Sequence, residues 1–207
     1  MRIPFLFVLL LPFVLAGCMQ WRPPPELTDQ GPVRDFAKWE RVRDAERADP
    51  SFTAAGIAGL DGKRNTEWLA LCRKAPELNR YAVVKAVNLF FNQWKYIEDR
   101  SNWGMADHWA TPREFVRKSG DCEDYAIAKY YALRFLGVAE DDLRIAAVWN
   151  KRRGEGHALL LVRDQGEFLL LDCLTDTLLD WEKAPQYLPR FSVNETFLWR
   201  LPVADSR

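Results

Sequence analysis

The stretch KSGDCEDYAIAKYYALRFLGV, Lys118–Val138, decides the fold of this chain. It predicts an α-helix that starts after an N-cap at Asp121, because an acidic N-cap with Asp124 three residues later forms a capping-box pattern. Gly137 is typical of the position that ends a helix. The helix places Cys122 in its first turn, with a carboxylate on either side.

Three carboxylates surround this cysteine, at Asp121, Glu123 and Asp124, and a carboxylate repels a thiolate. In one interpretation, the thiol of Cys122 is inert and the acids only cap the helix. In the other, Cys122 is a nucleophile and something positive offsets the acids. The free N–H groups and the macrodipole at a helix N-terminus favour a thiolate. Position alone leaves both interpretations open.

Helical patterns precede this stretch. Apolar residues recur at helical spacing in residues 78–94, and residues 34–48 combine mixed charge with spaced apolar positions. The segment TPREFVRKSG, residues 111–120, predicts a short helix opened by its Thr-Pro pair and closed by Gly120. The first half of the chain is therefore expected to be helical.

Short apolar runs follow, at residues 143–150, 157–164 and 167–174, and a tight polar turn around residues 164–166 joins the last two. Such runs are typical of antiparallel strands. Helices that precede strands, instead of alternating with them, predict an α+β domain and not a parallel α/β sheet.

The chain has two histidines, His108 and His157, so a base for Cys122 has few candidates. His157 opens one strand, and Asp172 lies near the end of the next. An even-numbered hairpin loop would put both side chains on one face of the sheet and turn Cys173 to the opposite face, into the core. An odd-numbered loop would exchange the positions of Asp172 and Cys173.

On one face, Asp172 would orient the imidazole of His157 and stabilise its charged form, and His157 would take the proton of Cys122. The N–H groups at the helix start would help to hold an oxyanion. The sequence therefore predicts a Cys-His-Asp arrangement for acyl transfer, with His108 in a surface role.

The N-terminus predicts export. Residues 1–17 combine one Arg with an apolar run too short to span a bilayer, which is typical of a signal peptide. The residues Leu-Ala-Gly-Cys, ending at Cys18, resemble the lipobox of bacterial lipoproteins, so we expect cleavage before Cys18 and a lipid anchor on it. The proline-rich residues 18–32 predict a tether, and residues 33–207 a single domain.

Charge and cysteine content exclude some function classes. The chain carries 29 Lys and Arg against 29 Asp and Glu, with no basic stripe, which argues against a nucleic-acid partner. If Cys18 carries lipid, then Cys72, Cys122 and Cys173 remain. This odd number leaves at least one thiol free or paired with another molecule. The sequence contains no CxxC pair, which argues against structural zinc.

Three motifs in order resemble a known family. The segments WATPREFVRKSGDCEDYAIAKYYALRFLGV, GHALLLV and LLLDCL are similar to those of the bacterial transglutaminase-like cysteine peptidases. The resemblance covers most of the chain after the tether. It implies a papain-like or transglutaminase-like core with its nucleophile at a helix N-terminus packed on an antiparallel sheet. It further implies that Cys122 is the nucleophile, His157 the base and Asp172 the orienting acid.

Members of this family are calcium-dependent, and the resemblance implies Ca²⁺ bound by Asp121 and Glu123. A dication beside Cys122 would offset the repulsion between the acids and a thiolate. Calcium takes about six to eight oxygen ligands, so two side chains would supply only part of its shell.

The resemblance implies a membrane-anchored periplasmic endopeptidase. Family members cut a large cell-surface adhesin and so control biofilm attachment, and an inner-membrane receptor that senses a cyclic dinucleotide regulates them. A protein substrate such as an adhesin and a receptor of this kind are therefore expected partners. In a Gram-negative source, Met19 after the lipidated cysteine predicts the outer membrane. The lipobox is where this chain departs from those relatives.

Other function classes stay open. One is a calcium-binding module that does not cut. Another is acyl transfer to an amine, as in transglutaminases, or cleavage of a peptidoglycan peptide. The products would separate them: a cleaved protein, an isopeptide cross-link or a trimmed muropeptide. An Asp at position 172, where the peptidoglycan amidases typically have a second His, favours the peptidase or the transglutaminase.

Overall fold

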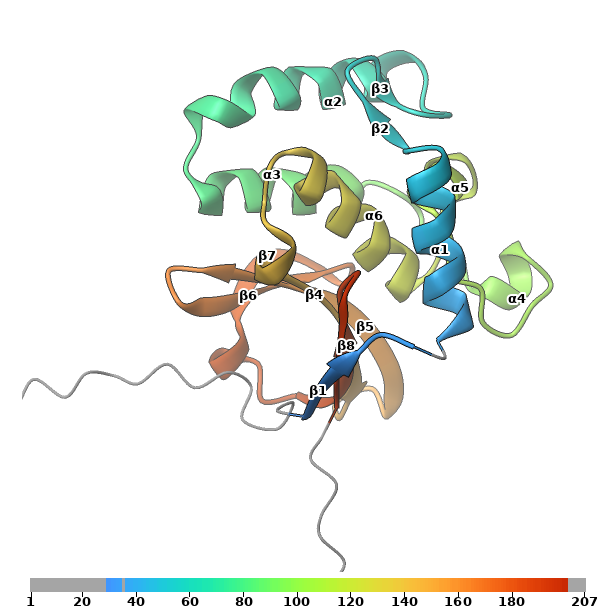
Figure 1. Cartoon of the computed structure of the whole chain (residues 1–207), viewed down its shortest axis with the longest axis vertical. Helices are drawn as coiled ribbons and strands as arrows, with labels where there is room; N and C mark the ends of the chain where they lie inside the picture. The colour runs from blue at the N-terminus through green and yellow to red at the C-terminus, as the bar shows by residue number, and fades with distance from the viewer. Residues whose placement is uncertain (1–28, 35, 201–207) are drawn as a thin grey trace, which may run out of the picture.

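The computed structural model describes residues 29–34 and 36–200, in which helices lie on one side of a curved sheet (Figure 1). The helices are α1 (Ala37–Ala48), α2 (Gly62–Lys74), α3 (Arg80–Phe91), α4 (Asp99–Asn102), α5 (Pro112–Lys118) and α6 (Cys122–Phe135). The strands are β1 (Asp29–Pro32), β2 (Phe52–Thr53), β3 (Gly56–Ile57), β4 (Leu143–Asn150), β5 (Glu155–Asp164), β6 (Glu167–Asp172), β7 (Thr175–Asp180), β8 (Tyr187–Val193) and β9 (Phe197–Arg200).

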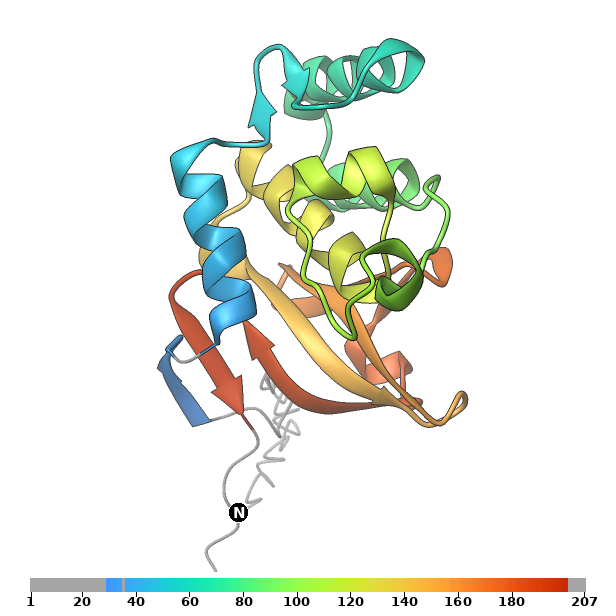
Figure 2. The same cartoon turned by 90° about the vertical axis from the view of Figure 1, so that its right-hand side faces the viewer.

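Seven strands form the main sheet in the order β1-β9-β8-β4-β5-β6-β7, and neighbouring strands are antiparallel. The helix α6 packs against β5 and also contacts α3 and α5. On the other side of the helix layer, α1 stands beside β8 and β9 (Figure 2). Its buried Trp39 donates the indole N–H to the carbonyl oxygen of Asn194, in the turn between those strands, at 2.8 Å. The α+β prediction is confirmed.

Alternate residues of each strand point to opposite sides of the sheet, and apolar residues are buried on both sides. The helix-side cluster lies between the sheet and the helices and includes Phe91, Tyr130 and Leu160. The far-side cluster lies on the other face and includes Leu159 and Tyr187. Burial on both faces explains why β5 reads as a continuous apolar run instead of an alternating one.

The local signals of α6 are confirmed. Asp121 is the N-cap, the capping box with Asp124 is present, and the helix begins at Cys122. Just after the helix, Gly137 has φ of 88°, a conformation that glycine adopts without a steric penalty. The sequence therefore placed the nucleophile candidate correctly in the first turn of a helix.

The end of α5 differs from the prediction. The helix stops at Lys118, and Ser119, with φ of 65°, takes the left-handed conformation that was expected at Gly120. Gly120 is required for space instead, because a Cβ there would lie 2.0 Å from Oδ2 of Asp124. The glycine thus allows the buried carboxylate of Asp124 to approach the backbone just before the nucleophile.

The last four residues of the predicted tether belong to the sheet, since Asp29–Pro32 form β1 and pair with β9. The predicted signal peptide and Cys18 lie outside the described residues. Among the helices of the described part, none is long and apolar enough to cross a membrane.

Candidate active site and metal centre

The β5–β6 hairpin brings His157 and Asp172 together. Asp164 pairs with Glu167, so the loop between them holds an even number of residues, as the favoured arrangement required. The imidazole Nε2 of His157 lies 2.8 Å from Oδ1 of Asp172, and both residues are buried. The structure therefore joins the predicted base and the predicted orienting acid in one hydrogen bond.

Asp172 is 2% exposed, and both of its carboxylate oxygens have donors. Oδ1 also accepts the backbone N–H of Leu174 at 3.0 Å, and Oδ2 accepts the hydroxyl of Tyr187 at 2.5 Å. Burial alone would raise the pKa of Asp172, but hydrogen bonds from His157 and these two donors outweigh it and hold the pKa below its ordinary value. A carboxylate on Nε2 fixes the tautomer that leaves Nδ1 of His157 as the proton acceptor.

Cys122 is half-buried at the start of α6, and its Sγ lies 3.2 Å from Oε2 of Glu123. Burial, and then the charges of Glu123 and Asp121, raise the pKa of the thiol. Burial and the carboxylates together thus outweigh the favourable helix N-terminus, and a cation beside the carboxylates would favour a thiolate.

The acids around the cysteine form a larger cluster than the sequence indicated. Carboxylate oxygens of Asp99, Asp121 and Asp124 lie within 4.8 Å of one another, and the same holds for Asp99, Asp107 and Glu123. Asp99 therefore links the two predicted ligands, Asp121 and Glu123. Sequence reasoning missed Asp99 and Asp107 because no local motif connects them to the cysteine.

The cluster has the properties of a cation site. Oδ1 of Asp99 and Oδ1 of Asp121 are buried and have no hydrogen-bond partner among residues 29–34 and 36–200. Burial, and then the charge of Glu123, raise the pKa of Asp121, and burial raises the pKa of Asp124 to about 8. Close carboxylates with unused oxygens suit a hard dication, which prefers oxygen ligands. This donor set fits Ca²⁺.

A cavity of about 190 Å³ opens beside His157. Tyr96 is part of its wall, and the backbone of Tyr96 pairs with Gly120, two residues before Cys122. One wall of the cavity is therefore tied to the turn that precedes α6. Its other lining residues are Arg153, Glu155, Gly156, Cys173 and Leu174.

Cys173 is not the plain core thiol that strand alternation predicted. It packs at the edge of the helix-side cluster, but its sulfur also lies within 4.8 Å of ligand atoms of His157 and Asp172. Alternation fails here because β6 ends at Asp172, so Cys173 belongs to the following turn. Burial raises the pKa of this thiol to about 12.

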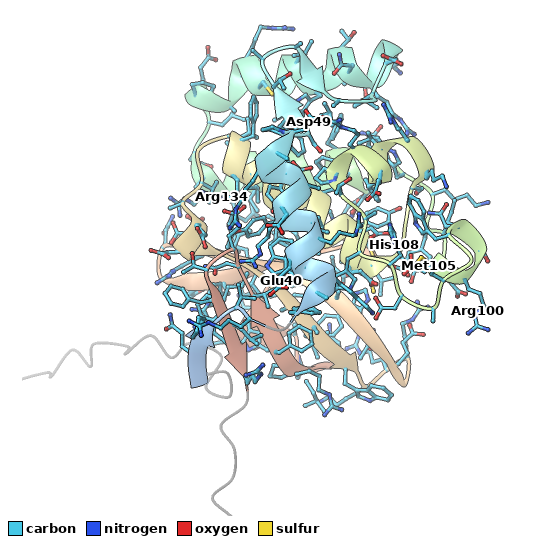
Figure 3. All side chains as sticks on the ribbon, turned by 45° about the vertical axis from the view of Figure 1, so that its right-hand side comes forward. Glu40, Asp49, Arg100, Met105, His108 and Arg134 are labelled. Atoms are coloured by element: carbon cyan, nitrogen blue, oxygen red, sulfur yellow. The ribbon has the colours of Figure 1, made fainter. Side chains whose placement is uncertain are left out.

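His108 lies beside α1, in the loop that also carries Met105 (Figure 3). Its ring is 4.2 Å from that of Trp103, and its Nε2 is 3.3 Å from a guanidinium nitrogen of Arg41. Its backbone N–H donates to Asp99 of the acidic cluster. The histidine thus connects its loop to Asp99 at the start of α4.

The model of the bacterial transglutaminase-like cysteine proteinase family (BTLCP) matches residues 69–205, about two thirds of the chain. This chain belongs to that family. The search of curated proteins gave no significant match to the proteinase.

Among solved structures, the proteinase is similar to Legionella pneumophila LapG in its calcium-bound form. The sequences are 28% identical and the TM-score is 0.60, with 81% of this chain and 90% of that chain covered. An EGTA-treated LapG structure from the same organism gives 27% identity and a TM-score of 0.58, covering 86% and 90%. Family and fold confirm the predicted transglutaminase-like architecture and a cysteine peptidase.

Proposed function

We propose that this proteinase is a calcium-dependent endopeptidase with Cys122 as nucleophile, His157 as base and Asp172 as orienting acid. The observation that carries the proposal is the buried hydrogen bond of 2.8 Å between His157 and Asp172. It lies beside a cavity whose wall at Tyr96 is tied to the turn before Cys122. The pair and the cavity support the roles of His157 and Asp172, and the position of Cys122 at the start of α6 supports its role as nucleophile.

The chemistry follows from the three assigned roles. Cys122 gives its proton to Nδ1 of His157, and the thiolate attacks the carbonyl carbon of the substrate. Backbone N–H groups at the start of α6 stabilise the resulting oxyanion. The imidazolium then donates its proton to the departing amine, which leaves a thioester. Water, deprotonated by His157, attacks the thioester and releases the acid and the thiol. Asp172 stabilises the imidazolium in both halves.

Calcium would be held by carboxylate oxygens of Asp99, Asp121, Glu123 and Asp124. When bound, a dication offsets the negative charge around Cys122 and so favours the thiolate. The unpartnered oxygens of Asp99 and Asp121 support this assignment, as does the similarity to a LapG structure solved with calcium.

The proposal includes a location and a substrate class. The lipobox ending at Cys18 supports a periplasmic enzyme anchored by lipid, at the outer membrane in a Gram-negative source. The substrate is a protein within reach of that membrane, such as a cell-surface adhesin, and an inner-membrane receptor would regulate its cleavage.

The test is the rate of Cys122 alkylation by iodoacetamide against pH, with calcium and with EGTA. We expect calcium to shift the titration below about 8.5, the pKa of an unperturbed cysteine. In His157→Ala, the thiol should not titrate below about 8.5 either with calcium or with EGTA. In Asp121→Ala, the titration should be the same with calcium as with EGTA. Asp44→Asn, an exposed carboxylate on α1, serves as the matched control and should behave as wild type.

The outcomes separate the open functions. A slow thiol that ignores both calcium and His157→Ala would refute the proposed nucleophile and favour a calcium-binding module that does not cut. A reactive thiol that yields isopeptide cross-links with a glutamine substrate and an amine, but no cleaved peptide, would reassign the enzyme as a transglutaminase. A cleaved protein with a new N-terminus, formed only with calcium, supports the endopeptidase.

A further inference from the structure

Lys129 is a buried cation in the helix that carries the nucleophile. It lies about two turns along α6 from Cys122, and its side chain is 0% exposed. Its ammonium donates to Oδ1 of Asn88 at 2.8 Å and to Oδ1 of Asn92 at 2.7 Å. The ring of Tyr125 lies 5.6 Å from the ammonium. A buried charge whose contacts are neutral groups is costly, so this lysine calls for an explanation other than stability.

The two amides extend the network to the triad acid. Nδ2 of Asn92 lies 3.0 Å from the carbonyl oxygens of both Asp172 and Thr175, and Nδ2 of Asn88 lies 3.2 Å from that of Thr175. An ammonium can only donate and a carbonyl can only accept, so each amide must turn its oxygen to Lys129 and its nitrogen to the turn. The lysine thus fixes the direction of both amides.

The turn after β6 needs such support. The pairing of β6 with β7 shifts register between Leu170 and Asp172, so the regular ladder is interrupted next to the acid. The amide of Asn88 comes from α3 and that of Asn92 from its C-cap, and α3 contacts both α6 and β7. The two amides replace contacts that a regular strand pair would have supplied and connect the helix layer to the end of β6.

We propose that Lys129 is a positioning residue, which acts through Asn92 and Asn88 to hold Asp172 against His157 at a fixed distance from the helix of Cys122. The inference rests on the proposed function. Lys129 touches no reacting atom; it sets where the acid lies and adds positive charge near it. In support, burial lowers the pKa of Lys129 to about 8, while the charges of Cys173, Asp172 and Asp176 act in the opposite direction, so the ammonium is the main form at pH 7.

Two variants of the full chain test the role. Lys129→Met keeps the length and removes the charge, and Asn92→Asp keeps an acceptor for the ammonium while it removes the donor to Asp172. Lys85→Met, an exposed lysine on α3, is the control. For each, kcat and KM of calcium-dependent cleavage are measured with the melting temperature. The ¹H–¹⁵N NMR signal of the His157 Nε2–H provides a readout of the pair that does not need turnover.

For both network variants, we expect a kcat at least tenfold lower with KM within threefold of wild type, and a shifted or broadened His157 signal in folded protein. Lys85→Met should leave all of these as they are. The proposal is overturned if folded Lys129→Met and Asn92→Asp both keep kcat within twofold and an unchanged His157 signal. If Lys129→Met fails to fold, Asn92→Asp alone decides. A wild-type protein that shows the signal but never cuts would instead refute the proposed function.

Discussion

Replacing Asp172 by Asn tests the orienting acid with little change of shape. Oδ1 of Asp172 accepts from both His157 and Leu174, whereas Oδ2 meets only the hydroxyl of Tyr187. The amide of an Asn can therefore place its oxygen where Oδ1 was and its nitrogen where Oδ2 was, beside the hydroxyl of Tyr187, which can accept as well as donate. The tautomer of His157 is preserved, and what is lost is one negative charge.

The magnitude follows from that charge. With charge centres about 4 Å apart and an effective dielectric constant of about 20, an imidazolium–carboxylate pair is worth about 4 kcal/mol. Since about 1.4 kcal/mol corresponds to a tenfold change in rate, Asp172→Asn should lower kcat about 10³-fold. The protein should stay folded, because each hydrogen bond keeps a donor and an acceptor.

The assay is single-turnover cleavage of a peptide substrate in saturating calcium, with circular dichroism as the check on folding. Asp141→Asn, an exposed carboxylate in the turn before β4, is the matched control and should cut at the wild-type rate. A folded Asp172→Asn enzyme that loses less than tenfold would show that the charge of Asp172 does not stabilise the imidazolium, and the assigned role would be wrong.

Three further predictions concern the acidic cluster. Calcium at about 100-fold above its dissociation constant should stabilise the folded protein by about 2.7 kcal/mol, which corresponds to a rise in melting temperature of about 8 °C. Asp99→Asn should remove most of that rise. An equal rise in the variant would exclude Asp99 as a ligand. In EGTA, the free energy of unfolding should fall as pH rises from about 4 to about 9, because raised pKa values of Asp121 and Asp124 let the folded state hold protons that the unfolded chain has released. Urea titrations that show a rise over this range would contradict the assigned cluster. Gly120→Ala should cost about 2 kcal/mol or more, because the new Cβ meets Asp124 at 2.0 Å, whereas Gly31→Ala, with open space around it, should cost far less.

The parts of the fold that the sequence predicted were those with local signals. The capping box of Asp121 and Asp124 marks the start of α6, and Gly137 marks its end. The sequence located the short polar turn of the β5–β6 hairpin but left its length open, and the structure gives it the even length that puts His157 and Asp172 on one face. In both cases the deciding interaction is close in sequence, so it leaves a readable pattern.

The parts that it missed depend on tertiary contacts. Asp99 reaches the cluster from the start of α4, more than twenty residues before the nucleophile, and Tyr187 reaches Asp172 from β8. Neither position has a pattern that distinguishes it from other acids or tyrosines. Cys173 was assigned by strand alternation, a rule that ends where the ladder does. Lys129 read as one polar residue of an otherwise ordinary helix, although its side chain is completely buried.

The candidate catalytic residues are supported by two different hydrophobic clusters. Cys122 opens a helix packed into the helix-side cluster, whereas the His157 ring stacks at 5.8 Å on Tyr187 of the far-side cluster. Turnover therefore depends on the packing of both clusters, while alkylation of the thiol depends more directly on the helix-side cluster. A cavity made by Leu159→Ala should slow cleavage at temperatures where calcium binding and the helix signal are still intact. In such a protein, the loss of cleavage would show that packing on the far side of the sheet is disturbed while the helices are still folded.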